Sequence, residues 1–356
     1  MLNSTKSYQM PSDADALRLL SAQGPELEAL YARADAVRRE HMSDTVFLRG
    51  IVEFSNVCAN DCCYCGIRAS NRKIRRYTMN EDEILEVARC LPESQQTTIV
   101  LQSGESEAFG DKELGALIQR IKRETPLAVT LSVGNRPPEV YRYWRECGLD
   151  RYLLRFETSD ARLFARLHPD CTLEERLACL TTMRDLGVQV GSGFMIGVPG
   201  ETPAVLSANI LLCRKLQLDM IGIGPFIVHP DTPMAGERNA YHDDPDMFFR
   251  ALAVLRLFNP KAHIPATTAY DAVFPGEGRN WCLQRGANVF MPNSTPAQYR
   301  ADYQLYPGKP CLNETGEQCA QCVIMRVQAL GRTIGSGPGH SRRTQEAPSE
   351  TGALTD

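Results

Sequence analysis

Short runs of β-branched and aromatic residues alternate along most of the chain with longer stretches whose apolar residues recur at helical intervals. This alternation is expected of parallel strands that are joined by crossover helices. It predicts eight strands, over residues 46–55, 98–102, 128–133, 151–156, 188–194, 220–224, 264–268 and 288–291. Helices are predicted at about 80–90, 111–124, 138–147, 173–186, 203–216, 244–258, 277–285 and 318–330. The fold class is therefore α/β, a (β/α)8 TIM-type barrel.

Both ends of the chain fall outside this alternation. Residues 14–42 carry apolar residues at helical spacing, broken at Gly24-Pro25, which predicts two helices in an N-terminal helical cap over residues 1–43. The barrel is expected to occupy residues 44–330. After Leu330 the sequence is rich in Gly, Pro, Ser and Thr and has no apolar period, so residues 331–356 are expected to form a partly mobile tail.

Polar side chains share one face of three predicted strands. Successive side chains of a strand point to opposite faces, and the face that carries the branched apolar residues should meet the helices. The opposite face carries Arg49, Ile51, Glu53, Ser55, Thr130, Ser132, Arg151, Arg155 and Glu157. A buried charge without a partner costs on the order of several kcal/mol, and a barrel filled only for packing would hold branched apolar residues there. The barrel is therefore expected to enclose a cavity for a polar, charged ligand.

The composition indicates a globular protein and argues against a nucleic-acid-binding or membrane protein. The 356 residues are 43% hydrophobic and 23% charged, as in a globular protein with a large core. A net charge of -4 and a pI near 6.0 argue against nucleic acid, because phosphate binding needs clustered Lys and Arg. The sequence shows neither a secretory signal nor a run long enough to span a membrane, so we expect a cytoplasmic protein without a membrane partner.

Thirteen cysteines in a reducing compartment are not expected to form disulfides, so clusters among them should be metal ligands or catalytic thiols. In CANDCCYC, Cys58, Cys62 and Cys65 have the spacing C-x3-C-x2-C and follow the first predicted strand, where barrel enzymes place their active sites. A cubane iron–sulfur cluster has four irons, so three thiolates leave one iron open to a ligand. A zinc knuckle is the alternative, although zinc prefers four closing ligands.

This triplet, with Tyr64 before its last cysteine, resembles the signature of the radical S-adenosylmethionine (SAM) superfamily. The resemblance implies a 4Fe-4S cluster on Cys58, Cys62 and Cys65, which act as its metal ligands and as the catalytic centre. It also implies that SAM binds the open iron through its amino and carboxylate groups. Reduction of the cluster would then cleave SAM to methionine and a 5'-deoxyadenosyl radical.

The inward polar residues are expected to bind this cofactor, which carries a carboxylate, an ammonium and a sulfonium and so needs partners of both charges. We expect Glu157 to face the ammonium or the ribose, and Arg155 or Arg176 to face the carboxylate. The other expected cofactor-binding residues are Tyr64, Gln102, Ser132 and Met220. The simpler alternative is that Glu157 and Arg155 pair only with each other and that Arg176 is solvated.

Longer stretches of the sequence narrow the resemblance to one family within this superfamily. RYLLRFET, GFMIGVPGET and DMIGIGPFIVHPDTP resemble the HydE family of FeFe-hydrogenase maturases, over about residues 44–330. A second triplet, Cys311, Cys319 and Cys322, lies in segment 305–325 near the C-terminal helix, with the spacing C-x7-C-x2-C. In that family such a triplet implies a second iron–sulfur cluster, 2Fe-2S or 4Fe-4S. The alternative is that these three thiols bind nothing.

The resemblance to HydE also implies a substrate and partners. The adenosyl radical would attack an iron–cysteine species that carries CO and CN, a precursor of the diiron subcluster of the hydrogenase H-cluster. A HydG-like partner would supply this small organometallic substrate, a HydF-like scaffold would act downstream, and reduced ferredoxin or flavodoxin would donate electrons. The residues expected to bind the anionic substrate are Arg49, Thr267, Thr268 and Tyr303.

Two other functions remain open at this point. On the same scaffold, the protein could be a methylornithine-synthase-like or another biotin-synthase-related enzyme that acts on an amino acid. Biotin synthase itself holds its auxiliary cluster with cysteines on barrel strands, which does not match a triplet near the end of the chain. In a different class, the protein could be an iron–sulfur carrier without catalysis, and the inward Arg and Glu residues would then have no ligand.

Overall fold

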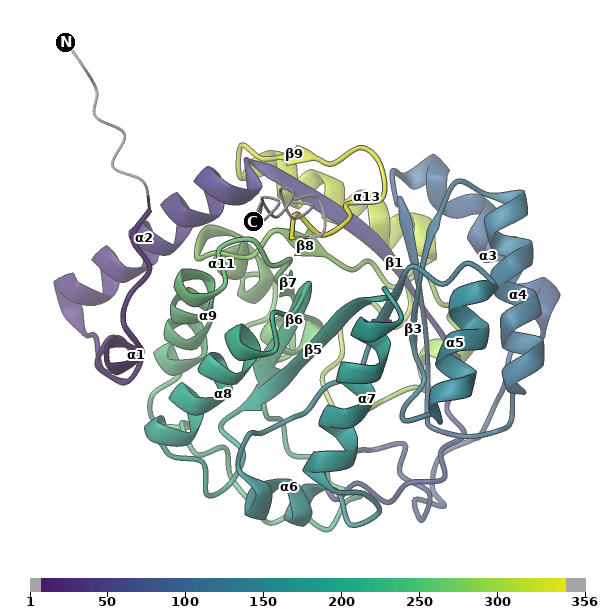
Figure 1. The fold of residues 1–356 in the computed structure, drawn as a ribbon, viewed down its shortest axis with the longest axis horizontal. Helices are drawn as coiled ribbons and strands as arrows, with labels where there is room; N and C mark the ends of the chain where they lie inside the picture. The colour runs from purple at the N-terminus through teal and green to yellow at the C-terminus, as the bar shows by residue number, and fades with distance from the viewer. Residues whose placement is uncertain (1–7, 344–356) are drawn as a thin grey trace, which may run out of the picture.

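Eight parallel strands form a nearly closed barrel in the computed structural model, which describes residues 8–343 (Figure 1). Neighbouring strands follow the order β6-β5-β4-β3-β2-β1-β8-β7, and a single bridge between Met220 and His263 joins β6 to β7. The strands are β1 (Thr45–Ser55), β2 (Thr98–Ser103), β3 (Ala128–Ser132), β4 (Arg151–Leu153), β5 (Gln189–Ile196), β6 (Met220–Pro225), β7 (Pro265–Ala266) and β8 (Val289–Phe290). The predicted α/β barrel is confirmed.

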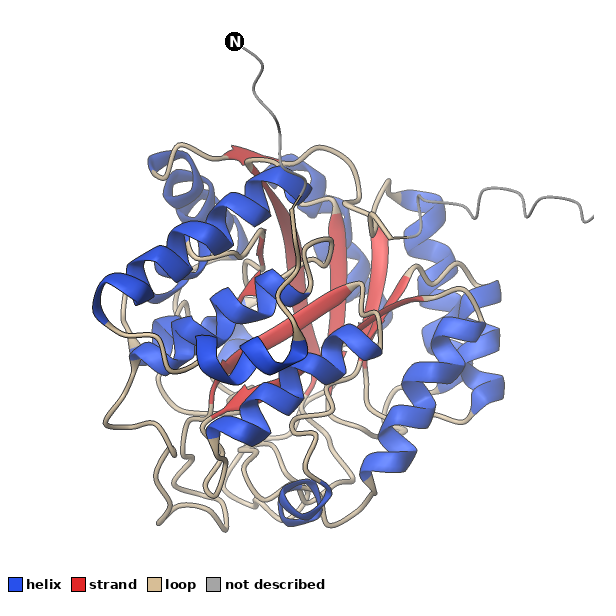
Figure 2. Cartoon of the chain, turned by 60° about the vertical axis from the view of Figure 1, so that its left-hand side comes forward, coloured by secondary structure: helices blue, strands red, loops and turns tan. Residues whose placement is uncertain are grey.

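Helices surround the strands on the outside (Figure 2). Those that match predicted helices are α3 (Glu81–Cys90), α4 (Asp111–Glu124), α5 (Pro138–Glu146), α7 (Leu173–Asp185), α8 (Pro203–Lys215), α9 (Asp246–Phe258), α11 (Gly278–Gln284) and α13 (Gly316–Ala329). No helix within residues 8–343 has the length and apolar character that crossing a membrane requires.

Several short elements were not predicted. They are the 3-10 helix η1 (Leu91–Ser94), the helices α6 (Ala161–Leu167), α10 (Thr268–Val273) and α12 (Ala297–Arg300), and the strand β9 (Thr333–Ile334). Segments this short hold too few residues to show an apolar period. The predicted strand 264–268 ends early because Thr267 is the N-cap residue of α10.

The two predicted leading helices are α1 (Asp13–Leu19) and α2 (Gly24–Met42). Gly24-Pro25 does not interrupt a helix but begins α2, where proline is tolerated because the first turn needs no internal N–H donor. The pair packs against α8 and α9 on the outside of the barrel (Figure 1). Every residue of α9 after Asp246 is buried, because α9 lies between the barrel and α2. That the pair forms a separate cap stays a prediction.

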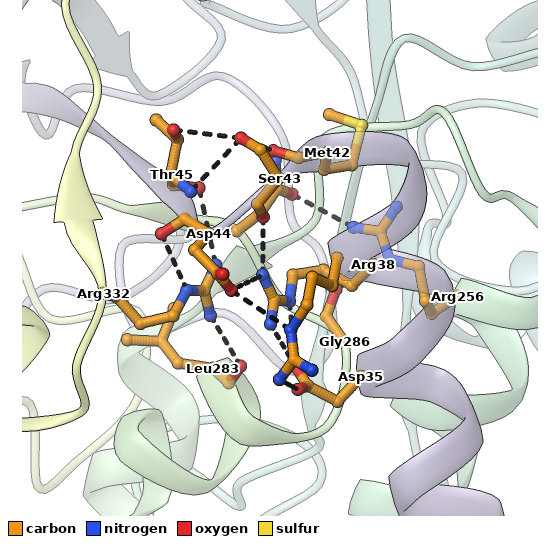
Figure 3. A network of polar contacts seen from close by, with 12 residues as sticks. Asp35, Arg38, Met42, Ser43, Asp44, Thr45, Arg256, Leu283, Gly286 and Arg332 are labelled. Carbon is orange, nitrogen blue, oxygen red and sulfur yellow. Dashed lines mark hydrogen bonds and ion pairs between the residues drawn. The ribbon is translucent and has the colours of Figure 1, made fainter.

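A polar network fixes α2 to the start of β1 and to the segment after α13 (Figure 3). Arg38 donates to the Ser43 carbonyl (2.5 Å) and to Asp44 Oδ1 (2.9 Å). Arg332 donates to the Asp44 carbonyl (3.1 Å) and to the Leu283 carbonyl (2.9 Å). The chain beyond Leu330 is therefore anchored to the amino-terminal end of the barrel.

Residues 331–343 lie across this amino-terminal end, where a partly mobile tail was predicted. β9 pairs with the start of β1, and the following carbonyls accept hydrogen bonds from inward arginines. Arg151 donates to the Pro338 carbonyl (2.6 Å), and Arg49 donates to the Gly339 carbonyl (3.3 Å). These contacts are made by backbone carbonyls, which do not depend on the side chains of the segment. Its composition, rich in Gly and Pro and without an apolar period, therefore did not indicate them. Residues 344–356 of the predicted tail lie outside the described residues.

Candidate active site

A cavity of about 310 Å³ opens at the carboxyl ends of the strands. This size is at the lower end of the roughly 300–1,000 Å³ of small-molecule sites. The predicted site residues that line it are Cys58, Cys62, Tyr64, Cys65, Gln102, Ser132, Arg155, Glu157, Arg176, Met220, Thr267, Thr268 and Tyr303. Arg49 and the second cysteine triplet do not line this cavity.

Backbone hydrogen bonds shape the loop that carries the first triplet. Ala59 N donates to the Glu105 carbonyl (2.7 Å), Cys63 N to the Leu167 carbonyl (2.8 Å), and Gly66 N to the Leu305 carbonyl (2.9 Å). A Cβ on Gly66 would lie 2.2 Å from the Gln304 carbonyl oxygen, so only glycine fits there. Three neighbouring loops thus hold the cysteine loop at the rim.

The guanidinium of Arg76 supports the same loop from within. It donates to the carbonyls of Asn56 (2.5 Å), Ile67 (2.7 Å) and Arg68 (2.6 Å). Cys63, the fourth cysteine of the loop, packs instead against an apolar cluster with Met195 and other residues. The loop therefore turns three thiols toward the cavity.

Burial and mutual proximity disfavour the free thiolates of the triplet. Desolvation raises the pKa of Cys58, raises the pKa of Cys62 further, and raises the pKa of Cys65 to about 12. The neighbouring thiols Cys65 and Cys58 add to the rise in the pKa of Cys62. A bound cation would draw these protons off, because ligating thiols must be deprotonated.

The donor set fits an iron–sulfur cluster. Three free thiols, those of Cys58, Cys62 and Cys65, line the same cavity. Thiolates are the usual ligands of iron–sulfur clusters, and three of them leave one iron of a four-iron cluster open. Cys58, Cys62 and Cys65 would hold it.

Charged groups that line the same cavity as the thiols have free hydrogen-bonding capacity. Arg155 Nη2 and Glu157 Oε2 form an ion pair at 3.0 Å, so the predicted pairing exists. Yet these two atoms, together with Arg155 Nε and Arg176 Nε, are buried without a hydrogen-bond partner among the described residues. Buried polar atoms are rarely left unsatisfied, so this wall can accept a polar ligand.

The backbone at Glu157 is strained. Its φ is +61°, in the left-handed region that a residue with a Cβ rarely adopts. Burial raises the pKa of the Glu157 carboxyl, while Arg155 opposes the rise. Such strain clusters at functional sites, where the surrounding structure enforces it. It aims this carboxyl into the cavity just beyond β4.

Hydroxyl groups line another part of the cavity. Gln102 Nε2 donates to the hydroxyl of Tyr303 (3.1 Å), a buried residue of the loop that follows α12 (Ala297–Arg300). The Thr268 and Tyr306 hydroxyls lie 2.6 Å apart. Thr267 Oγ1 donates to the Ile223 carbonyl (2.8 Å), so this hydroxyl is already partnered. Tyr303 therefore lines the cavity.

Arg49 lies at the opposite end of the barrel from the cysteine loop, although it points inward as predicted. Its Nη1 donates to Met220 Sδ (2.8 Å) and its Nη2 to the Gly339 carbonyl (3.3 Å). With Arg151 and His263 it lines a small space of about 10 Å³ next to residues 338–340. This position is away from the large cavity, so we correct the expectation that Arg49 contacts the substrate there.

The second triplet lies on the outside of the barrel. Cys311 precedes α13, buried Cys319 and exposed Cys322 lie on α13, and Asn293 N donates to Cys319 Sγ (3.3 Å). A hydrogen bond joins the Cys311 and Cys319 thiols, and it favours the thiolate form of one member of the pair by lowering its pKa. This pair is therefore suited to act as a ligand.

Four further acidic or basic residues line the cavity and were not among the predicted site residues: Glu53, Glu105, His168 and Lys309. Strand parity placed Glu53 on the inward face of β1 without giving it a ligand, and Glu105 follows β2 by two residues, so its strand position could have indicated it. His168 and Lys309 lie in irregular segments that carry no sequence period. Only the fold brings them to the cavity.

Comparisons with known proteins agree with this fold. The sequence profile of the Radical SAM superfamily matches residues 52–208. The [FeFe] hydrogenase maturase subunit HydE of Thermotoga maritima is 44% identical over 319 residues, which cover 90% of this chain and 90% of that protein. Biotin synthase of Magnetococcus marinus is 32% identical over 282 residues, 78% of this chain and 86% of that protein. The crystal structure of methylornithine synthase matches with a TM-score of 0.80 at 25% identity, covering 92% of this chain and 95% of that one.

A parallel barrel with a three-cysteine loop at the carboxyl ends of its strands defines the class, and the chain belongs to the radical SAM superfamily of enzymes. The similarity over nine-tenths of the chain confirms the closer resemblance as well. Within the superfamily this chain belongs to the family of the [FeFe] hydrogenase maturase HydE.

Proposed function

We propose that this enzyme cleaves SAM reductively and directs the 5'-deoxyadenosyl radical at an iron–cysteine species with CO and CN ligands, on the way to the diiron subcluster of [FeFe] hydrogenase. One observation carries the proposal. The first cysteine triplet, the Arg155–Glu157 pair with its unsatisfied atoms, and Tyr303 line the same cavity. The 44% identity to HydE supports this substrate over others.

The cofactor would bind between the thiols and the charged wall. A 4Fe-4S cluster on Cys58, Cys62 and Cys65 supplies, when bound, the electron that breaks a carbon–sulfur bond of SAM. Glu157 and Glu105 are carboxylates suited to the SAM ammonium, and Arg176 is suited to its carboxylate. Gln102, Ser132, Tyr64 and Met220 are the remaining proposed contacts.

The close approach of β5 and β6 shapes the floor of the SAM pocket. A Cβ on Gly193 would lie 1.9 Å from the Gly222 carbonyl oxygen, and Gly193 has a φ of +154°. Only glycine allows the two strands to lie this close. Gly222 in turn lines the cavity without a side chain, which leaves room for the adenosine part of SAM.

The substrate would bind on the side of Thr268 and Tyr303. An iron complex with CO and CN is anionic, and Arg155 is a cation that lies half-buried in the same cavity. Thr268, Tyr303 and the partnered Thr267 line this side. We keep Thr267, Thr268 and Tyr303 as proposed substrate contacts, add Arg155 to them, and leave Arg49 out.

The proposed partners follow from this reaction. A HydG-like enzyme would supply the iron complex, a HydF-like scaffold would act downstream, and reduced ferredoxin or flavodoxin would donate the electron. We also infer a cytoplasmic location, because none of the thirteen cysteines is in a disulfide and such thiols persist in a reducing compartment. A second iron–sulfur cluster, 2Fe-2S or 4Fe-4S, is proposed on Cys311, Cys319 and Cys322.

The test is anaerobic turnover with competing substrates. The reconstituted protein is reduced with dithionite and given SAM together with either a synthetic iron–cysteine–CO–CN complex or lysine. We expect 5'-deoxyadenosine to form and the iron complex to be consumed, while lysine is unchanged. Arg155→Met should lose consumption of the iron complex, because the variant keeps the volume of the side chain but removes the cation.

Each alternative has its own outcome in this assay. Conversion of lysine without reaction of the iron complex would indicate a methylornithine-synthase-like enzyme, whose known structure has a similar fold. Absence of 5'-deoxyadenosine under all conditions, in protein that carries the cluster, would indicate an iron–sulfur carrier. Either result would overturn the proposal.

A further inference from the structure

His168 lies between two residues of the cysteine loop. Its Nδ1 is 3.3 Å from Cys62 Sγ, and its Nε2 is 3.3 Å from the hydroxyl of Tyr64. The imidazole ring stacks on Phe164 of α6, with ring centroids 4.6 Å apart. His168 is 4% exposed and lines the cavity. These contacts fix both the position and the rotation of the ring.

The surroundings of the ring dictate which nitrogen carries the proton. A cysteine that ligates iron is a thiolate, which can only accept a hydrogen bond, so Nδ1 must be the donor toward Cys62. The ring is buried and its two nitrogens face a sulfur and a hydroxyl, an environment that suits a neutral imidazole with one N–H. With that proton on Nδ1, Nε2 is an acceptor, and the Tyr64 hydroxyl is placed to donate to it.

The phenol of Tyr64 is suited to this donor role. Its side chain lines the cavity, and its hydroxyl faces His168 Nε2. A phenol is an ordinary hydrogen-bond donor at neutral pH. The result is a directed chain in which Tyr64 O–H donates to His168 Nε2, and His168 Nδ1–H donates to Cys62 Sγ.

We propose that His168 is a positioning residue that donates a hydrogen bond to the ligating sulfur of Cys62, held in the required tautomer by Tyr64, and thereby raises the reduction potential of the cluster. A hydrogen bond to a ligating sulfur stabilises the reduced, more negative state of an iron–sulfur cluster. A second partner that fixes the tautomer of a histidine is a recurrent feature of metal sites. The proposal rests on the proposed function, because it requires an iron–sulfur cluster on the first triplet.

The test measures the midpoint potential of the first cluster, not turnover. Holoprotein is reconstituted anaerobically in a Cys319→Ala background, so that one cluster dominates the signal, and is titrated with dithionite under electron paramagnetic resonance. His168→Phe preserves the ring stack on Phe164 but removes the donor, and it should shift the midpoint potential to more negative values. His168→Gln, whose amide can donate, should shift the potential less.

Tyr64→Phe tests whether the hydrogen bonds run from Tyr64 through His168 to Cys62. It removes only the hydroxyl, so the tautomer of His168 is no longer fixed and the potential should fall by less than in His168→Phe. Because Tyr64 acts through His168, the double variant should have the potential of His168→Phe alone. His242→Phe is the matched control, since His242 pairs with Asp243 on the surface, and its potential should equal that of the parent.

The outcomes separate this proposal from the proposed function. A His168→Phe protein with the parental iron content and the parental potential overturns the role of His168. If His168→Phe assembles no cluster, Tyr64→Phe decides, and an unchanged potential there overturns the proposal. Parent protein that binds no cluster at all would instead overturn the proposed function, and the role of His168 with it.

Discussion

At the scale of single residues, a buried ion pair holds the loop over the cavity. Lys309 Nζ pairs with Glu53 Oε1 and donates to the Tyr303 carbonyl (3.1 Å), and both charged side chains are almost fully buried. Thr295 Oγ1 lies 3.4 Å from the second carboxylate oxygen of Glu53. The pair therefore ties β1 to the segment that carries Tyr303 and Tyr306.

Removal of one member of this pair should destabilise the protein strongly. Lys309→Met leaves the carboxylate of Glu53 buried without its cation, which costs about 3–5 kcal/mol, whereas removal of both charges costs less. We expect urea denaturation to show a larger loss of stability for Lys309→Met than for the double variant Glu53→Gln/Lys309→Met. Equal losses in the two variants would mean that the charge pair does not fasten the loop.

The residue scale also shows what strand parity can predict. Parity identified Arg49, Glu53, Arg155 and Glu157 as inward side chains, and all four point into the barrel. It does not say which end of the barrel each one reaches. Arg49 and Glu53 share a face of β1 but lie four residues apart, about 13 Å along a strand, so one meets residues 338–340 and the other meets the cavity.

At the scale of elements, the segment after β9 packs against Phe47 through a glycine. A Cβ on Gly339 would lie 2.6 Å from Phe47 Cδ1, and Gly339 has a φ of +56°. Gly337 has a similar φ of +75°, but a Cβ there meets nothing within 4 Å. The two positions share the backbone penalty of a left-handed residue and differ only in steric contact.

Gly339→Ala should therefore cost more stability than Gly337→Ala. Both variants pay about 1–2 kcal/mol for the left-handed backbone, and overpacking against Phe47 adds about 1–3 kcal/mol at position 339 only. Thermal unfolding of the two variants measures the difference. If both lose the same stability, residues 338–340 do not pack on Phe47 in solution.

The turn after β5 contains a buried carboxyl that makes stability depend on pH. Glu201 Oε2 accepts from Gly197 N (2.8 Å) and Val198 N (3.3 Å), and burial raises the pKa of Glu201 to about 8. Its pKa in the unfolded chain is near 4.5. Between these values the folded state holds a proton that the unfolded state has lost.

Stability should therefore fall as pH rises from about 4.5 toward 8, by at most roughly 1.4 kcal/mol per pH unit from this group. The contribution of Glu201 is fully present below the unfolded pKa and is lost as pH rises through the folded pKa. Glu201→Gln keeps an oxygen acceptor for both N–H groups and removes the titration. We expect its denaturation midpoint to change less between pH 5.5 and 8.5 than that of the wild-type protein. Parallel pH profiles would contradict this assignment.

Long elements were predictable, and short ones were not. The apolar period of α4 or α7 spans several turns, so their predicted bounds agree with the structure to within one residue. By contrast, β7 and β8 have two residues each, and α6 has seven. Tertiary contacts decide such short pieces, and α6 matters for function because it brings His168 to the cysteine loop.

At the scale of the whole molecule, the barrel separates two polar ends. The amino-terminal end is covered by residues 338–340 on Arg49 and Arg151, and the carboxyl end opens into the cavity with the three thiols. Met220 lies between them, since it lines the cavity and accepts from Arg49. The sequence predicted the barrel and the end that carries the cysteine loop. It did not predict the end covered by residues 338–340, because the contacts there are made by backbone carbonyl groups, which every residue carries.

The central claim is that Cys58, Cys62 and Cys65 hold a cluster with one iron open to SAM, while Cys63 takes no part. Removal of Cys62 should abolish this cluster, whereas Cys63→Ala should keep it, because Cys63 packs in an apolar cluster beside Met195.

The most direct measurement is electron paramagnetic resonance of the reduced, anaerobically reconstituted protein in a Cys319→Ala background, with and without SAM. We predict a 4Fe-4S signal that changes when SAM is added, in the parent and in Cys63→Ala, and no such signal in Cys62→Ala. Protein that binds zinc at this loop, or a signal that SAM leaves unchanged, would contradict the claim.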